Sequence, residues 1–209
     1  MGGGSSAAAV HQEQASRRGW ALTLAAAIAL GVTSLLANLT SAGQLQGREQ
    51  EWLAVRRTLS LLLNSGSVWA GLGVFAGWCL RRPVAAALGS ALSLALALAV
   101  HYLLGIAVGS LGWESFSRNG SWFLAAAVVG PVLGLVGATT HSDRWFGLLA
   151  RLFVPAGSVV EPWVRQWWSA PATAGWPTVA SGWVASVLLT AAGLAGAWVA
   201  LSRRSAPTV

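Results

Sequence analysis

The sequence predicts an all-α fold, a polytopic bundle of transmembrane helices, from its composition, the spacing of its charges and its tryptophans. Hydrophobic residues make up 55% of the 209 residues and charged residues only 9%, whereas soluble domains carry about 25% charged residues. So few ionisable groups cannot cover the surface of a soluble protein, which excludes a soluble enzyme and a nucleic-acid-binding domain. Most of the 13 tryptophans flank long uncharged stretches, as amphipathic rings do at a membrane–water interface.

Five uncharged stretches are each long enough for one membrane crossing, because a helix needs about 20 apolar residues to cross the hydrocarbon core. Backbone groups find no water there, so each stretch is predicted to be a helix. The predicted spans cover residues 19–38, 58–80, 83–105, 121–140 and 179–201. They form a single transmembrane domain, 19–201, between a disordered N-terminal tail, 1–18, and a short C-terminal tail, 202–209.

The segment 144–168 has two interpretations. Its apolar residues recur at helical spacing with Arg144 and Arg151 on another face, and Pro155 interrupts them. That pattern is typical of an interfacial amphipathic helix. It is equally compatible with a sixth, broken crossing in which the side chain of Arg151 reaches toward the surface.

The arginines favour six crossings over five with an interfacial or broken helix, because basic residues are enriched on the cytoplasmic side of membrane proteins. With the N-terminus in the cytoplasm, residues 81–82 and 143–144 lie there as well. Residues 203–204 join them only if 146–164 also crosses, which places both termini in the cytoplasm. Three arginines fall outside in this topology and oppose it: Arg48, Arg56 and Arg57.

The arginine pair at the start of the first span also fits a second interpretation. Arg17 and Arg18 before an apolar stretch are similar to a twin-arginine export signal. A first membrane span with cytoplasmic arginines is the preferred interpretation, because the later spans leave no folded domain to export. The expected location is the cell membrane.

The chain contains no motif of a soluble enzyme. It has no Gly-rich phosphate loop followed by Lys, no His-Glu-x-x-His and no Cys-x-x-Cys. Cys79 is the single cysteine, so no internal disulfide can form. The three histidines are far apart in sequence. We therefore expect no enzyme activity, no catalytic residue, no metal and no cofactor. The remaining alternative is a membrane-embedded enzyme, for which Glu161 and His101 are the only acid–base pair.

Polar side chains inside the predicted spans are the best pointers to function, because they are expensive in lipid. Asn64, His101, Tyr102 and Glu161 all fall toward the extracytoplasmic side in the six-span topology. Together they are predicted to line an outward-facing polar pocket. The protein would then be a small-solute-binding or transport component; the alternative is that each residue is simply hydrated at the interface.

Pairs of small residues four apart allow two helices to approach closely. Such pairs are Gly73 with Gly77 and Gly130 with Gly134, and Pro131 beside the second pair is expected to kink its helix. Their expected role is packing within the bundle. The alternative is a face for a membrane protein partner or a homo-oligomer, which would make the chain a structural or partner-binding protein without a small-molecule ligand. In either case the lipid bilayer is the expected environment, and nucleic acid is not an expected partner.

Several short segments together resemble a family of small bacterial multi-pass membrane proteins known as a domain of unknown function. They are residues 63–69, 75–77 and 130–137, the pair His101-Tyr102, Trp113 and Glu161. The resemblance covers about residues 19–201 and implies a bacterial inner membrane protein without an assigned activity. In size, span count and the small residues Ala21 and Ala25, the chain also looks like the substrate-binding subunits of energy-coupling-factor vitamin transporters.

Overall fold

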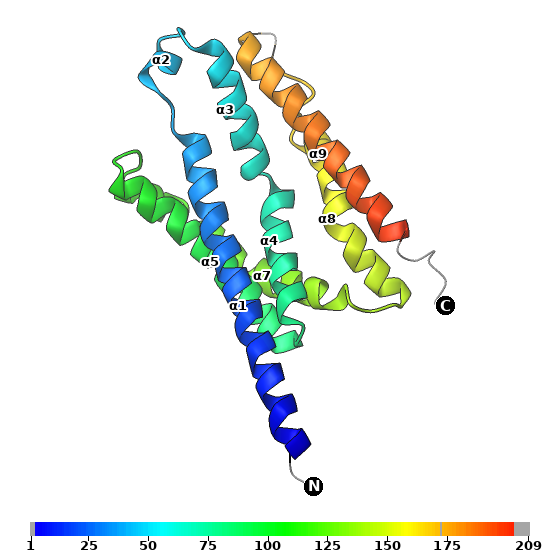
Figure 1. Ribbon diagram of the computed structural model, residues 1–209. Coiled ribbons are helices and arrows are strands. Elements are labelled where there is room, and N and C mark those ends of the chain that lie inside the picture. Colours follow the sequence, from blue (N-terminus) through cyan, green and yellow to red (C-terminus); the bar gives the residue numbers. More distant parts are fainter. Residues whose placement is uncertain (1–2, 172, 203–209) are drawn as a thin grey trace.

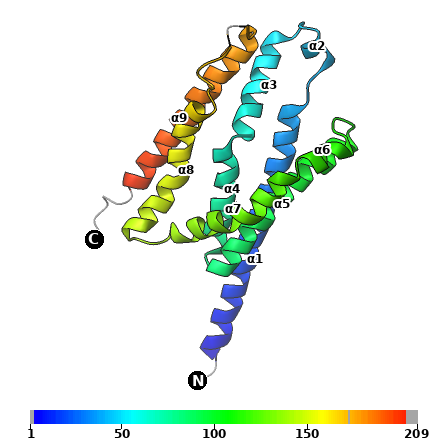
Figure 2. The ribbon, with the colours of Figure 1, turned by 180° about the vertical axis from the view of Figure 1, so that it is seen from behind.

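The computed structural model describes residues 3–171 and 173–202, and every regular element in this part of the chain is a helix (Figure 1). The all-α prediction is confirmed. The long segments run alternately in opposite directions, and α3 and α4 follow one another in the same direction with a bend between them (Figures 1 and 2). The helices are α1 (Gly3–Asn38), α2 (Ala42–Leu45), α3 (Gln50–Leu63), α4 (Gly66–Leu80), α5 (Pro83–Ala107), α6 (Trp113–Arg118), α7 (Gly120–Thr139), α8 (Trp145–Val164) and α9 (Trp176–Ser202).

Four helical segments of the described chain are long and apolar enough to cross a membrane, and the bent pair α3–α4 is a fifth if it is one span. The four are Ser16–Asn38, Pro83–Ala107, Gly120–Thr139 and Trp176–Ser202. A helical bundle built to span a membrane therefore fits the fold. The segment predicted as a sixth crossing forms the helix α8, which is not among these candidates and which carries Arg151 and Glu161.

The predicted span 58–80 is right in its end at Leu80 but differs from the structure in its start and its continuity. Its helix begins at Gln50 and is divided into α3 and α4, whose axes differ by 44°. Asn64 ends α3, and Ser65 starts a new helix as its N-cap, its Oγ accepting a hydrogen bond from Val68 N at 3.2 Å. Serine is a preferred N-cap because its hydroxyl satisfies an otherwise unpaired backbone N–H.

The N-terminal tail also differs from its expectation. The backbone of residues 3–18 is helical and continuous with the first span as α1, where a disordered segment was predicted. Alanines at positions 7–9 favour helix most strongly of all residues, and an existing span removes the nucleation step. The expected C-terminal tail lies outside the described residues except for Ser202.

The interior is built from small and aliphatic side chains of α1, α4, α5 and α7. Its buried members are Ala27, Leu30, Leu72, Leu94, Ala97, Leu98, Tyr102, Ala126 and Leu133. A smaller cluster joins α3 to α9 through Ala185 and Leu189. The outer faces are apolar as well: Leu92 on α5 and Val128 on α7 are 56% and 62% exposed. Apolar residues on both the inner and outer faces are typical of helices surrounded by lipid.

The glycines predicted to pack helices lie where α4, α5 and α7 cross. A Cβ on Gly77 would be 2.0 Å from the carbonyl oxygen of Gly134, and one on Gly134 would be 2.1 Å from that of Ala86. A Cβ on Gly73 would be 2.9 Å from Leu133, and one on Gly130 would be 2.7 Å from the Cα of Ala91. These helices approach so closely only because the side chains are absent. The helix α7 continues through Pro131 without ending there.

Candidate functional site

Polar side chains of α1, α3 and α5 meet beside the junction of α3 and α4. Ser34, which is fully buried, donates a hydrogen bond from Oγ to Asn64 Oδ1 at 2.6 Å and lies 3.1 Å from His101 Nδ1. Asn64 Nδ2 donates to Ser60 O at 2.9 Å and to Asn38 Oδ1 at 3.3 Å. Ser60 Oγ donates to the same Asn38 oxygen at 2.6 Å. We call these five residues the polar network.

The single hydroxyl proton of Ser34 fixes the direction of the hydrogen bonds. It is directed to Asn64 Oδ1, so it cannot also serve His101. The 3.1 Å contact with His101 is then a bond in which Nδ1–H donates to Ser34 Oγ. A neutral His101 ring in this tautomer presents Nε2 as a free acceptor, and at the other end of the network the Asn38 amide keeps free N–H donors. No described side chain pairs with either group.

Glu161 lies on the other side of the junction and binds the first turn of α4. Its carboxylate accepts hydrogen bonds from Gly66 N at 2.6 Å, from Ser67 N at 2.8 Å and from Ser67 Oγ at 2.7 Å. Arg165, one turn further along α8, is 3.9 Å from the same carboxylate. A negative group is favourable at a helix N-terminus, where backbone N–H groups are unpaired and the helix dipole is positive.

Tyr102 packs in an aromatic cluster with Phe116 and Phe123, whose ring centroids lie 5.9 and 6.2 Å from its own. Its ring also meets the ring of His101 edge-on at 5.2 Å. The tyrosine is buried among apolar side chains. Tyr102 is therefore a core residue that packs against the ring of His101.

The structure therefore brings together only part of the predicted pocket. Asn64 and His101 share the polar network through Ser34, Tyr102 supports it, and Glu161 approaches the same junction from α8. Two cavities of the described chain lie beside Trp78, near the other end of α4, and neither is lined by any of these four residues.

Three members of the polar network are absent from the predicted pocket: Ser34, Asn38 and Ser60. A signal for them exists in the spacing. Ser34 precedes Asn38 by four residues on α1, and Ser60 precedes Asn64 by four residues on α3. Residues four apart share one helix face, so each serine–asparagine pair marks a polar stripe on an otherwise apolar helix.

Arg56, which opposes the predicted topology, has a structural role at this end of the bundle. Its guanidinium group donates from Nη1 to Ala37 O at 3.0 Å and from Nε to Gln44 Oε1 at 3.1 Å. The first bond satisfies a backbone carbonyl in the last turn of α1, where a cation is favourable. The hydrogen bond to the end of α1 therefore explains why Arg56 lies at the end of the bundle that the predicted topology places outside the cytoplasm.

The described residues define a class, a multi-helix protein with apolar outer faces and a polar network at the junction of a divided helix. Within these residues no three His, Cys, Asp or Glu side chains are placed to hold a metal ion. No family model, no curated protein and no solved structure matches the chain. Its function must therefore be argued from the site itself.

Proposed function

We propose that the protein binds a small neutral polar solute at the polar network, as a component of a membrane transport system. The observation that carries this proposal is the meeting of Asn38, Asn64 and His101 from three helices in an otherwise apolar bundle. Polar groups in membrane spans are expensive and mark ligand or ion pathways. Divided spans are the usual place for such sites in transporters, because their free backbone ends and flanking side chains can contact the substrate.

The free groups of the network indicate the chemistry of the solute. The Asn38 amide offers N–H donors and His101 Nε2 offers an acceptor, while the hydrogen bonds among Ser34, Ser60 and Asn64 hold both in place. Among the described residues, no carboxylate or arginine hydrogen-bonds to the network. A solute with adjacent donor and acceptor groups, such as a polyol or an amide, matches this arrangement better than an ion does.

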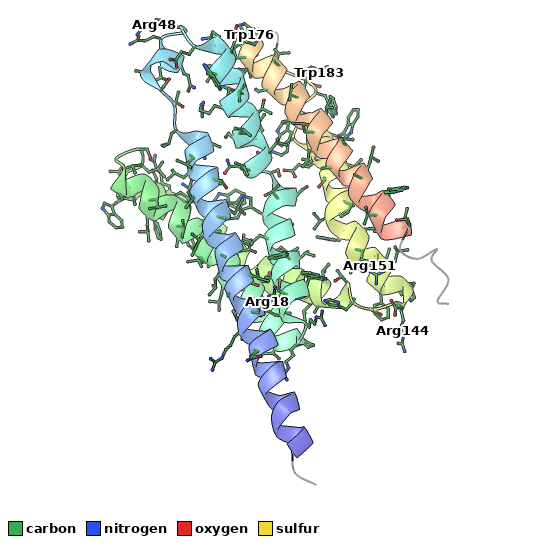
Figure 3. The ribbon with its side chains drawn as sticks, viewed as in Figure 1. Arg18, Arg48, Arg144, Arg151, Trp176 and Trp183 are labelled. Carbon is green, nitrogen blue, oxygen red and sulfur yellow. The ribbon has the colours of Figure 1, made fainter. Side chains whose placement is uncertain are left out.

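The proposed topology has six crossings, with α3 and α4 forming one and α8 another. The helix α8 has 20 residues, as does α7, and about 30 Å of helix is enough to cross the hydrocarbon core. It runs antiparallel beside α9 (Figure 2). Arg18, Arg144 and Arg151 lie toward one end of the bundle, and Arg48 and Trp176 lie at the other (Figure 3). The first end is then cytoplasmic by the positive-inside rule, as are both termini, and the network faces outward.

A structural or partner-binding role is the alternative, and the glycine contacts do not favour it. Gly73, Gly77, Gly130 and Gly134 contact other helices of the same chain, so they are not free to receive a second protein.

We also propose that the protein belongs to the bacterial family that its sequence resembles and that it lies in a bacterial inner membrane.

Thermal stabilisation in lipid nanodiscs tests the proposal. The wild-type protein is screened against a panel of polyols, sugars, amides and amino acids. We expect at least one compound to raise the unfolding temperature of the wild type, and to leave that of Asn38→Leu and His101→Phe unchanged. Both variants remove a free group of the network.

His141→Phe is the matched control, because His141 lies away from the network, with its Nε2 3.0 Å from Trp78 O. It should keep the stabilisation by the same compound. The proposal fails if no compound in the panel stabilises the wild type, or if Asn38→Leu and His101→Phe respond as strongly as it does.

A further inference from the structure

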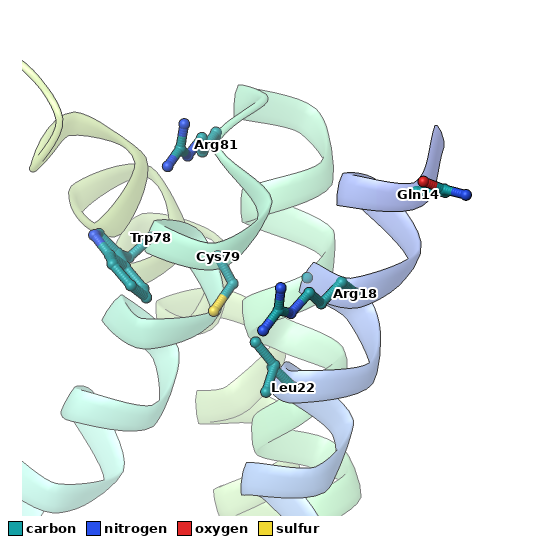
Figure 4. Close-up of a pocket in the computed structure, with 7 residues that line it drawn as sticks. Gln14, Arg18, Leu22, Trp78, Cys79 and Arg81 are labelled. Atoms are coloured by element: carbon teal, nitrogen blue, oxygen red, sulfur yellow. The ribbon is translucent and has the colours of Figure 1, made fainter. Parts of the chain in front are cut away.

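A cavity of about 470 Å³ lies between α1 and the end of α4 (Figure 4). Along both helices it is far from the polar network, which lies near the end of α1 and the start of α4. It is lined by Gln14, Arg18, Gly19, Leu22, Trp78, Cys79 and Arg81. The helices α1 and α4 are in close contact beside it, since a Cβ on Gly19 would come within 2.9 Å of the carbonyl oxygen of Cys79. The cavity is therefore an open hollow next to the contact between α1 and α4.

Two guanidinium groups line this cavity, those of Arg18 and Arg81. Arg18 reaches the cavity from α1 and Arg81 from the end of α4 (Figure 4), and no carboxylate of the described residues forms an ion pair with either. Arg81 also has a φ of +59°, which side-chain-bearing residues rarely adopt. Two unpaired guanidinium groups match the oxygen atoms of a phosphate.

Apolar surface continues from the two arginines toward the middle of the bundle. Leu22 follows Arg18 by one helical turn on α1, and Trp78 precedes Arg81 by about one turn on α4. Both side chains are 47% exposed. The candidate span of α1 begins at Ser16, which puts Arg18 at the boundary between water and lipid. The lining of the cavity is thus cationic at the boundary between water and lipid, and apolar one helical turn further toward the middle of the bundle.

We propose that this cavity is a binding site for an anionic phospholipid, with the headgroup phosphate between Arg18 and Arg81 and the acyl chains along Leu22 and Trp78. Basic pockets between transmembrane helices are suited to such headgroups. A free phosphate ion would use the arginines and leave the apolar face uncovered. The amphipathic order of the lining therefore favours the lipid, and the site is independent of the solute-binding role proposed above.

The single cysteine of the chain, Cys79, supplies a reporter inside the cavity. The protein is reconstituted in phosphatidylcholine nanodiscs with and without a small fraction of phosphatidylglycerol, and the rate of Cys79 alkylation by N-ethylmaleimide is measured. We expect phosphatidylglycerol to slow alkylation of the wild type by about tenfold and to slow that of Arg18→Gln/Arg81→Gln by less than twofold. Native mass spectrometry should show bound phosphatidylglycerol on the wild type and its loss from the double variant.

Arg57→Gln/Arg118→Gln is the matched control, since it removes the same charge from exposed residues of the far end. It should retain both the protection of Cys79 and the bound lipid. A third arm adds inorganic phosphate to phosphatidylcholine nanodiscs. Protection by phosphate as strong as that by phosphatidylglycerol would assign the site to a soluble anion and overturn the lipid proposal. If phosphatidylglycerol protects Cys79 equally in Arg18→Gln/Arg81→Gln and in Arg57→Gln/Arg118→Gln, the protection reflects surface charge alone. That result would also overturn the lipid proposal.

Discussion

At the residue scale, the buried hydroxyl of Ser34 connects the side chains on which the proposed function depends. It lies between Asn64 and His101, which come from different helices, and it has no exposure to solvent. A buried polar group that loses its partner keeps its desolvation penalty. The network therefore stabilises the contact of α1 with α3 and α5 only while all of its members are present.

Ser34→Ala should lower the free energy of unfolding by about 1–2 kcal/mol, because it leaves Asn64 Oδ1 and His101 Nδ1 without their shared partner. Reversible unfolding in mixed detergent micelles measures the loss. Thr33→Ala is the neighbouring control, since Thr33 Oγ1 bonds only to carbonyls of its own helix. It should change the free energy of unfolding by less than about 0.5 kcal/mol. Equal losses in the two variants would argue against a special role for Ser34.

The sequence predicts which polar residues are unusual better than it predicts which residues they contact. Asn64 and His101 stand out because each interrupts an apolar stretch, but Ser34 looks like any other serine in a span rich in small residues. Whether two helices meet depends on how they pack and rotate, which their separate hydropathy patterns do not specify. Tyr102 shows the same limit: it neighbours His101 in sequence, yet it faces Phe116 and Phe123 in the core.

At the scale of elements, the division between α3 and α4 is the feature that organises the site. Ser65 caps α4 from within the chain, and Glu161 completes the cap from α8. The carboxylate thereby couples the position of α8 to the start of α4. Without such partners, the free N–H groups of a helix that starts among apolar segments would be costly.

Glu161→Gln should lower the free energy of unfolding by about 1.5–3 kcal/mol, since the amide has a single acceptor oxygen for the N–H groups of Gly66 and Ser67 and turns its own donors toward one of them. Urea or detergent-denaturant titration measures this change. The control is Glu114→Gln, at an exposed carboxylate in the first turn of α6. A loss for Glu161→Gln no greater than that of the control would show that the cap contributes little to stability.

The division itself is only partly visible in the sequence. Ser65 and Gly66 are weak helix formers that favour caps, but they lie inside a stretch long enough for one uninterrupted span. The length of an uncharged stretch therefore predicts a crossing and overlooks the break. The partner of the new helix, Glu161, is 95 positions from Gly66, and no local pattern connects the two.

At the scale of the whole molecule, close glycine contacts hold α4, α5 and α7 together. Gly77 and Gly134 bring backbone against backbone, so van der Waals contact replaces the burial of large side chains. Such packing suits a protein in lipid, where the hydrophobic effect does little to join helices. The bundle thus places its small residues inside and leaves many of its large apolar ones on the surface.

Gly77→Ala should lower the free energy of unfolding by about 1–3 kcal/mol, because its Cβ would be 2.0 Å from a backbone oxygen of α7 and the helices would have to move apart. Gly71→Ala, on the same helix, is the control. Its Cβ would meet Val154 at an ordinary 3.7 Å, so the higher helix propensity of alanine should leave the protein unchanged or more stable by up to about 1 kcal/mol. If Gly77→Ala is tolerated as well as Gly71→Ala, the close contact between α4 and α7 is not essential.

The central claim is that this chain crosses a membrane six times with both ends on one side, and labelling of single cysteines tests it most directly. In a Cys79→Ser background, one cysteine at a time is introduced at Ser41, Ser117, Ser169, Ser142 or Ser202. Each is exposed to a membrane-impermeant maleimide in right-side-out and in inverted vesicles. We predict that the cysteines at positions 41, 117 and 169 are labelled from the outside only. Those at positions 142 and 202 should be labelled from the cytoplasmic side only. Labelling of position 169 from the cytoplasmic side and of position 202 from the outside, as five crossings require, or of all positions from both sides, would contradict the account.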